Sequence, residues 1–216
     1  MAGDIISFAL LAISSVLIIV NPLGATLIYV SLTTNLDPQV RTLIARDACR
    51  YALFILLFVA ILGAGILQLL GISLEAFRIA GGILLFGIGM EMVYARTSRT
   101  KLTATEKYES RDMEDIAIMP LAIPMIAGPG AITTTIVLMN EATAIALPAV
   151  GIVVLSVVLS IVITYYMMKN SDYIMSKIGQ REYRAINRLM GMLLIAIAVE
   201  FVLTGVRTAF PLLAGG

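Results

Sequence analysis

Residues 5–33 read IISFALLAISSVLIIVNPLGATLIYVSLT, a run of 29 residues that contains no charged side chain. A helix needs about 20 apolar residues to cross the hydrocarbon layer of a membrane, so this run is long enough to span it. Its centre carries Asn21, Pro22 and Gly24. Proline lacks an amide hydrogen and glycine accepts backbone angles that other residues avoid, so we expect the helix to be interrupted at mid-membrane.

The composition of the whole chain is that of a membrane protein. Of its 216 residues, 60% are hydrophobic and 13% are charged, and the mean hydropathy is +0.99. These values exclude a soluble cytosolic enzyme. The chain has one cysteine, Cys49, and no histidine, which excludes an intrachain disulfide and the usual zinc and copper sites. A net charge of +1 offers no overall electrostatic attraction for nucleic acid, so we expect no nucleic-acid partner. We also expect no metal and no other cofactor.

Six long apolar runs carry charges only at their edges: Ile5–Thr33, Ala48–Leu70, Ala76–Tyr94, Ile116–Met139, Ala144–Met168 and Leu189–Val206. They lack the two-residue alternation of barrel strands, and lipid offers no partner to free backbone polar groups, so we expect helices. The sequence therefore predicts an all-α membrane protein with six transmembrane helices. We divide it into residues 1–96, a cytoplasmic connector at residues 97–115, and residues 116–216.

Basic residues are unevenly distributed between the two sides of these spans. Thirteen of the fifteen follow the first, third and fifth spans: Arg41, Arg46, Arg50, Arg96, Arg99, Lys101, Lys107, Arg111, Lys169, Lys177, Arg181, Arg184 and Arg188. Arg78 and Arg207 lie on the other side. Because Lys and Arg in short loops stay in the cytoplasm, we expect a multi-pass protein of the cell membrane with both termini outside the cytoplasm.

The two halves of the chain resemble each other. Residues 82–91, GILLFGIGME, align with residues 191–200, GMLLIAIAVE, and residues 21–26, NPLGAT, align with residues 128–133, GPGAIT. Three crossings per half would make the second half enter from the opposite side, as in the inverted repeats of secondary transporters. Chance similarity between apolar helices is the alternative. We therefore expect two inverted three-helix repeats whose first helix is broken at mid-membrane.

The two breaks are the candidate binding site. Each would create a helix N-terminus that attracts a carboxylate and free carbonyls that attract an ammonium group or a cation. A proline kink in a purely packed helix is the alternative interpretation. The candidate substrate-binding residues are Asn21, Pro22, Gly24, Ala25, Thr26, Gly128, Pro129, Gly130, Ala131, Thr133 and Thr134.

The segments at residues 21–26 (NPLGAT) and 120–133 (PLAIPMIAGPGAIT) resemble the two signature regions of the MarC family of six-helix membrane proteins. Length, the number of spans and the stretch Arg188 to Gly191 also fit, so the resemblance covers essentially the whole chain. It is closest to the small neutral amino acid transporters of that family, and it implies proton-coupled movement of glycine and alanine. In many members a further proline follows the first segment, where this chain has Leu27.

Glu91 and Glu200 are acids within predicted spans, where ionisable groups are costly and often functional. In a chain without histidine, proton coupling would have to use carboxylates, bound water or the substrate, so both are coupling or gating candidates. Glutamates at the interface or in structural pairs are the alternative. Sodium remains the alternative coupling ion.

We expect a carrier, not an enzyme, because histidine and paired acids deep within one span are absent from the sequence. A channel and an exporter of other metabolites or drugs remain alternatives. Gly82 and Gly89 lie seven residues apart on one helix face, which fits packing within the bundle or against a second copy in a homo-oligomer.

Overall fold

The computed structural model describes residues 2–94, 116–177 and 179–210, and these residues contain no strand. In chain order the elements are α1 (Ala2–Val20), α2 (Pro22–Thr33), α3 (Pro38–Leu69), α4 (Leu74–Val93), η1 (Ala117–Ile126), α7 (Pro129–Ile145), α8 (Leu147–Lys169), α9 (Ser171–Lys177) and α10 (Gln180–Ala209). The predicted connector at residues 97–115 lies outside the described residues.

Five helical stretches are long and apolar enough to cross a membrane: Ile5–Thr33, which joins α1 and α2, then α3, α4, α8 and residues 185–209 of α10. The pair η1 and α7 passes the same test as one span bent by 54°. The prediction of an all-helical membrane protein with several spans is thereby confirmed. The described residues provide five candidate spans, or six if the bent pair of η1 and α7 is counted as one further span.

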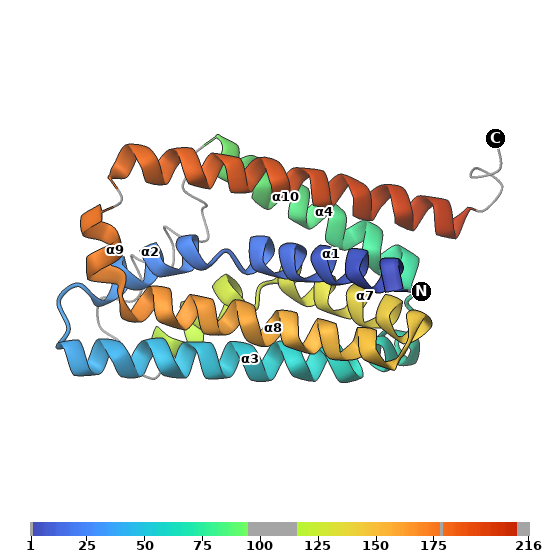
Figure 1. Ribbon diagram of the computed structural model, residues 1–216, viewed down its shortest axis with the longest axis horizontal. Helices are drawn as coiled ribbons and strands as arrows, with labels where there is room; N and C mark the ends of the chain where they lie inside the picture. Colours follow the sequence, from blue (N-terminus) through green and yellow to red (C-terminus); the bar gives the residue numbers. More distant parts are fainter. Residues whose placement is uncertain (1, 95–115, 178, 211–216) are drawn as a thin grey trace.

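The spans lie roughly along one axis, and Figure 1 shows the two ends of the bundle. We call the end where α1 begins and α10 finishes the termini end. The opposite end, where α2 finishes, α3 begins and the short helix α9 lies, is called the α9 end. The α1/α2 junction and the η1/α7 junction both lie between these two ends.

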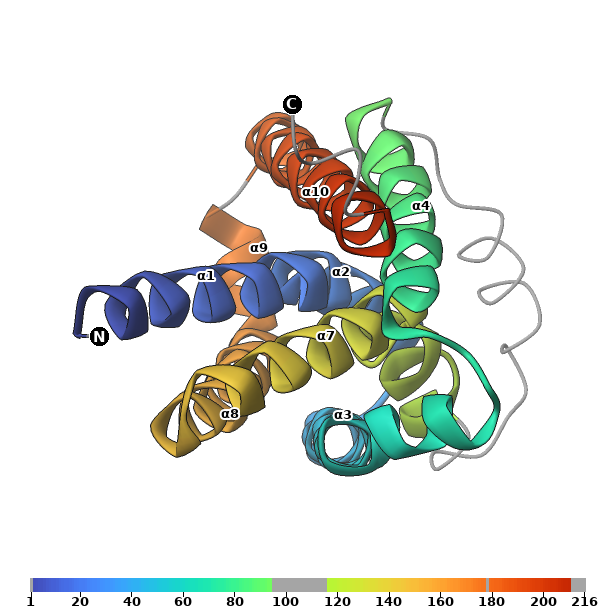
Figure 2. The ribbon, with the colours of Figure 1, turned by 90° about the vertical axis from the view of Figure 1, so that its right-hand side faces the viewer.

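The larger part of the buried core lies between the helices α1, α2, α3, α7 and α8 and the segment η1. Helices α4 and α10 pack against each other along their length and form a second apolar cluster around Leu85, Leu194 and Phe201. Figure 2 shows this pair beside α1 and α7. The pair therefore covers the side of the bundle on which α1 and α7 would otherwise be open.

Glycines allow α4 and α10 to approach closely. A Cβ atom at Gly89 would lie 2.9 Å from the carbonyl oxygen of Gly191, and one at Gly82 would lie 2.8 Å from the carbonyl oxygen of Ala198. Such distances leave no room for a methyl group beside rigid backbone. Gly82 and Gly89 thus pack within the bundle, which decides between the two placements that the sequence allowed.

We predict that Gly89→Ala lowers the thermal stability of the detergent-solubilised protein, since the new methyl group overpacks the contact at a cost of about 1–3 kcal/mol. Gly87→Ala is the matched control, because nothing lies within 4 Å of a Cβ atom there. Alanine is favoured over glycine inside a helix by roughly 0.5–1 kcal/mol, so the control should be neutral or stabilising. Equal melting temperatures for the two variants would contradict this packing.

Candidate functional site

The first junction is a single residue in a left-handed conformation. Asn21 has φ 49° and ψ 67°, and its side-chain oxygen accepts a hydrogen bond of 3.2 Å from the amide of Gly24 at the start of α2. Pro22 follows as the first helical residue and has no amide to donate. Within the described residues no backbone amide donates to the carbonyls of Ile19 and Val20. The end of α1 therefore presents unpaired carbonyl oxygens.

The second junction is more irregular. Met119 and Ile123, each preceding a proline, have extended backbone angles inside η1, in keeping with the steric restriction on residues before proline. Helix α7 then begins at Pro129 after Gly128, and no side chain caps its N-terminus. In the part of the chain that the structure describes, the amides of Gly130 and Ala131 donate to no backbone carbonyl. The start of α7 therefore presents unpaired amides.

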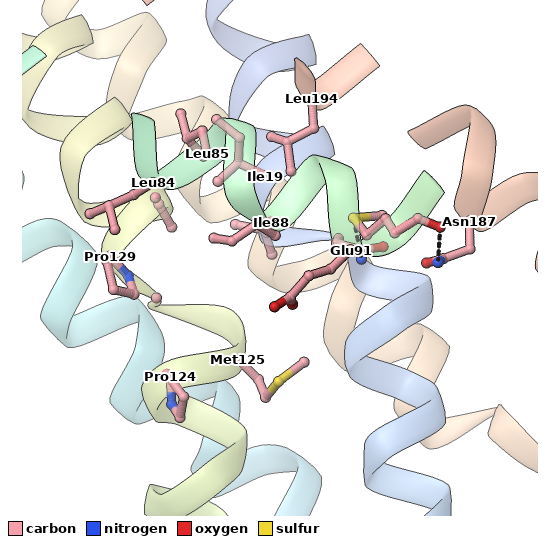
Figure 3. Close-up of a pocket in the computed structure, with 16 residues that line it drawn as sticks. Ile19, Leu84, Leu85, Ile88, Glu91, Pro124, Met125, Pro129, Asn187 and Leu194 are labelled. Carbon is pink, nitrogen blue, oxygen red and sulfur yellow. Dashed lines mark hydrogen bonds between the residues drawn. The ribbon is translucent and has the colours of Figure 1, made fainter. Parts of the chain in front are cut away.

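A partly open cavity of about 370 Å³ lies where the two junctions meet. This volume is in the usual range for a small-molecule site, about 300–1,000 Å³. Figure 3 shows its walls coming from both junctions and from α4 and α10. The lining residues are Ile19, Val20, Asn21, Leu84, Leu85, Ile88, Glu91, Met92, Pro124, Met125, Gly128, Pro129, Gly130, Ala131, Asn187 and Leu194.

The walls are mostly apolar, with a few polar groups at defined places. Among the described residues that line the cavity, Glu91 alone carries a formal charge, and Figure 3 shows its carboxylate pointing into the space between η1 and α4. The side-chain amide of Asn187 donates to the carbonyl oxygen of Met92 at 3.5 Å. The amide nitrogen of Asn21 lies 4.0 Å from the sulfur of the same methionine.

Six of the candidate residues from the sequence share this cavity: Asn21, Gly128, Pro129, Gly130, Ala131 and Glu91. The structure does not place the others on its wall, namely Pro22, Gly24, Ala25, Thr26, Thr133, Thr134 and Glu200. The candidate site is therefore made by the junctions themselves and not by the helical turns that follow them. Binding by any of these residues stays a prediction.

The threonines after the junctions are buried and mostly bond within their own helices. The hydroxyl of Thr26 donates to the carbonyl of Pro22 at 2.7 Å, and that of Thr133 donates to the carbonyl of Pro129 at 2.9 Å. Thr134 differs, because its buried hydroxyl has no hydrogen-bond partner among the described residues. Glu200 lies on an exposed face of α10 and accepts a hydrogen bond of 3.2 Å from Thr204. The structure thus separates Glu200 from Glu91.

Several cavity residues from α1, α4, α10 and η1 were missed from the sequence. The missed residues are Ile19, Val20, Leu84, Leu85, Ile88, Met92, Pro124, Met125, Asn187 and Leu194. For α4 a signal existed, because Leu84, Ile88 and Glu91 follow helical spacing on one face. For Asn187 the sequence held no such signal, since its place depends on how α10 packs against α4.

Comparison with known proteins assigns the family. Residues 6–210 match the model of the MarC family of integral membrane proteins. The chain belongs to this family. The UPF0056 membrane protein MJ1677 of Methanocaldococcus jannaschii is 40% identical over 94% of this chain and 98% of its own length.

Two bacterial relatives agree with this assignment. The UPF0056 membrane protein YvbG of Bacillus subtilis is 35% identical over 96% of this chain and 98% of its own length. YhcE of Escherichia coli, also a UPF0056 membrane protein, is 36% identical over 89% of each chain. No solved structure matches the chain. The cavity described above is therefore a feature of a MarC-family membrane protein.

We predict that Asn21→Ala destabilises this MarC-family protein more than Asn21→Gly does. Alanine loses the cap to Gly24, typically worth about 1 kcal/mol, and it also strains the left-handed backbone by roughly 1–2 kcal/mol. Glycine loses the cap alone, because it accepts a positive φ without strain. Thermal unfolding of the purified variants checks the order, and a less stable glycine variant would contradict it.

Proposed function

We propose that this protein is a secondary transporter of small neutral amino acids such as glycine and alanine, coupled to protons and working by alternating access. The observation that carries the proposal is the cavity at the two junctions. Its lining residues include Gly130 and Ala131, whose amides donate to no backbone carbonyl of the described residues, and Ile19 and Val20, whose carbonyls accept from no backbone amide there. Few polar groups at fixed positions on an apolar wall are typical of a small-molecule site.

Both charged groups of an amino acid find complementary groups in this cavity. Unpaired amides and the dipole at the start of α7 favour a carboxylate. The carbonyls at the end of α1 and the carboxylate of Glu91 favour an ammonium group. The described lining has no cationic side chain, so we expect substrates with a second negative charge to be disfavoured next to Glu91.

The apolar walls and the glycines set the size of the substrate side chain. Gly130 lies against Leu85, and a Cβ atom at Gly130 would collide with that leucine. The absence of a side chain at residue 130 therefore lets Leu85 pack against the start of α7. A small apolar substituent suits such a wall, whereas a polar one would leave its own hydrogen-bonding groups unpaired.

We propose Glu91 as the proton-binding group. Among the described lining residues it is the one carboxylate, and an ionisable group of a spanning helix that faces a cavity is a typical proton relay. Sodium is the alternative ion, since unpaired carbonyls at a helix end also coordinate cations. Glu200 faces away from the cavity and has no part in this scheme.

Alternating access requires two parts that move relative to each other, and we propose that these are inverted repeats with broken first helices. Pro22 and Pro129 occupy the same first position of α2 and α7. Helix α8 packs against α1 and α2, and helix α3 packs in the corresponding way against η1 and α7. These matching contacts support a two-fold relation between the halves.

We also propose that the α9 end faces the cytoplasm, which leaves both termini outside it. Among the described residues, Arg41, Arg46, Arg50, Lys169 and Lys177 lie toward the α9 end, whereas Arg78 and Arg207 lie toward the termini end. This asymmetry follows the rule that retains Lys and Arg on the cytoplasmic side.

Uptake of radiolabelled alanine and glycine into proteoliposomes tests the proposal. We predict that Gly130→Val reduces uptake to background, because the isopropyl group collides with Leu85 and displaces it on the cavity wall beside the α7 amides. Gly151→Val is the matched control, since a Cβ atom at Gly151 on α8 meets nothing within 4 Å. Full uptake by the Gly130 variant, with the control equally active, would refute this site.

Coupling is tested by imposing a pH gradient. We predict that an inwardly directed proton gradient accelerates alanine uptake by the unaltered protein and has no effect on Glu91→Gln, which cannot exchange a proton. Glu200→Gln is the control and should keep its response. A Glu91→Gln protein that still responds to the gradient would remove Glu91 from the coupling mechanism.

A further inference from the structure

We propose that the ion pair between Arg78 and Glu141 is a gate that holds the termini end of the cavity closed. This inference rests on the proposed transport function, because a gate has a meaning only where access alternates. It assigns a role to two residues that the binding site itself does not use.

The pair joins the two halves of the chain at depth. Arg78 on α4 donates from its guanidinium to Glu141 on α7 at 2.5 Å. The side chain of Arg78 is 9% exposed, that of Glu141 is 37% exposed, and the Nε atom of Arg78 is buried with no hydrogen-bond partner among the described residues. A guanidinium with so little other support depends on its carboxylate, since an unpaired buried charge is strongly disfavoured.

Beneath the ion pair, the same two helices are tightly packed. A Cβ atom at Gly81, three residues after Arg78, would collide with the side chain of Thr133, and one at Gly130 would collide with Leu85. Thr133 is itself 3% exposed. Helices α4 and α7 thus form a seal that runs from the ion pair to the wall of the cavity.

The cavity extends in the opposite direction. Helix α4 runs toward the α9 end and carries Glu91 near its finish, whereas α10 starts at that end and carries Asn187 near its start. Both residues line the cavity, whereas Arg78 and Glu141 do not. In this proposal, the arrangement corresponds to a state that is closed at the termini end.

The proposed repeat also relates the residues at the two ends. Arg78 lies four residues before Gly82, and Asn187 lies four residues before Gly191, the glycine aligned with Gly82. Glu141 lies thirteen residues after Gly128, and Thr34 lies thirteen residues after Asn21, which is aligned with Gly128. An ion pair at the termini end is thus replaced by asparagine and threonine at the α9 end.

Asn187 and Thr34 are uncharged, so they cannot form an ion pair that closes the α9 end. Asn187 donates to the carbonyl of Met92, and the hydroxyl of Thr34 donates back to Val30 in its own helix at 2.6 Å. Of these two aligned pairs of positions, the pair at the termini end therefore forms an ion pair and the pair at the α9 end does not. Opening the termini end requires α4 and α7 to separate and this contact to break.

The experiment measures access to the cavity from each end, independently of any substrate. In a Cys49→Ala background, Ala131→Cys places a thiol on the cavity wall, and a membrane-impermeant maleimide is applied to either side of proteoliposomes. Asn35→Cys and Thr143→Cys, at exposed positions of the α9 end and the termini end, identify the side that the reagent reaches.

With the ion pair intact, we expect the thiol at residue 131 to be labelled from the α9 end and protected from the termini end. Glu141→Gln, and Arg78→Gln combined with Glu141→Gln, should raise the labelling rate from the termini end by about tenfold, a typical size for a shift between two states. Exchanging the charges, Arg78→Glu with Glu141→Arg, should restore protection.

A second ion pair provides the matched control. Arg41 on α3 contacts Asp172 on α9 at 2.9 Å, with its side chain 15% exposed. Arg41→Gln removes an ion pair of the same chemistry at the α9 end and should leave labelling from the termini end unchanged. Labelling of the residue 131 thiol from the α9 end reports that each variant is folded. The variant with both Arg78→Gln and Glu141→Gln leaves no unpaired charge buried at this site.

Each outcome decides the proposal. If Glu141→Gln and the double variant lower the melting temperature but keep the protection from the termini end, the pair is structural and the gate is wrong. A rise that Arg41→Gln reproduces would show general loosening and would also overturn it. If labelling from the termini end rises in a protein that transports no amino acid, the gate is supported and the proposed substrate is wrong. If the protein transports amino acids but labelling from the termini end does not rise, the gate alone is wrong.

Discussion

Lipid cannot hydrogen-bond a peptide group, and this constraint governs the rest of the structure. Every backbone amide and carbonyl inside the membrane needs a partner within the protein or a cavity to face. Away from the two junctions, the long apolar helices satisfy the constraint through their own hydrogen bonds. The two junctions, at Asn21 and at Gly128, do not, and both are enclosed by the bundle at the cavity. The residues whose backbone groups lack a backbone hydrogen-bond partner at the two junctions, among those described, thus line the cavity.

Helices α4 and α10 enclose this region from one side. Their close approach depends on Gly82, Gly89 and Gly191, which place backbone against backbone. The same helices supply Leu85, Glu91 and Asn187 to the cavity wall. The contact between α4 and α10 therefore also positions Glu91, which is the one charged side chain among the described residues of the cavity wall. Through this contact, the packing of the third helix of each half affects the cavity.

A few charged side chains among the described residues lie at the cavity or join helices near the two ends of the bundle. Glu91 faces the cavity, Arg78 and Glu141 join α4 to α7 near one end, and Arg41 and Asp172 join α3 to α9 near the other. Burial makes the two arginines dependent on their partners, because the cost of desolvating an ion must be offset by a partner or by water. These few contacts are therefore where differences between the states of a carrier would be concentrated.

The sequence by itself determined the helical class and the approximate spans, because both rest on a local property, the length of each apolar run. Family membership also followed from the residues around the junctions. What only the tertiary structure decided was which side chains share a space. Glu91 and Glu200 occupy equivalent positions in sequence, yet one faces the cavity and the other an exposed face of α10. Arg78 meets Glu141 across 63 residues of chain. Such pairings depend on how helices rotate and pack against one another, which no local pattern of residues specifies.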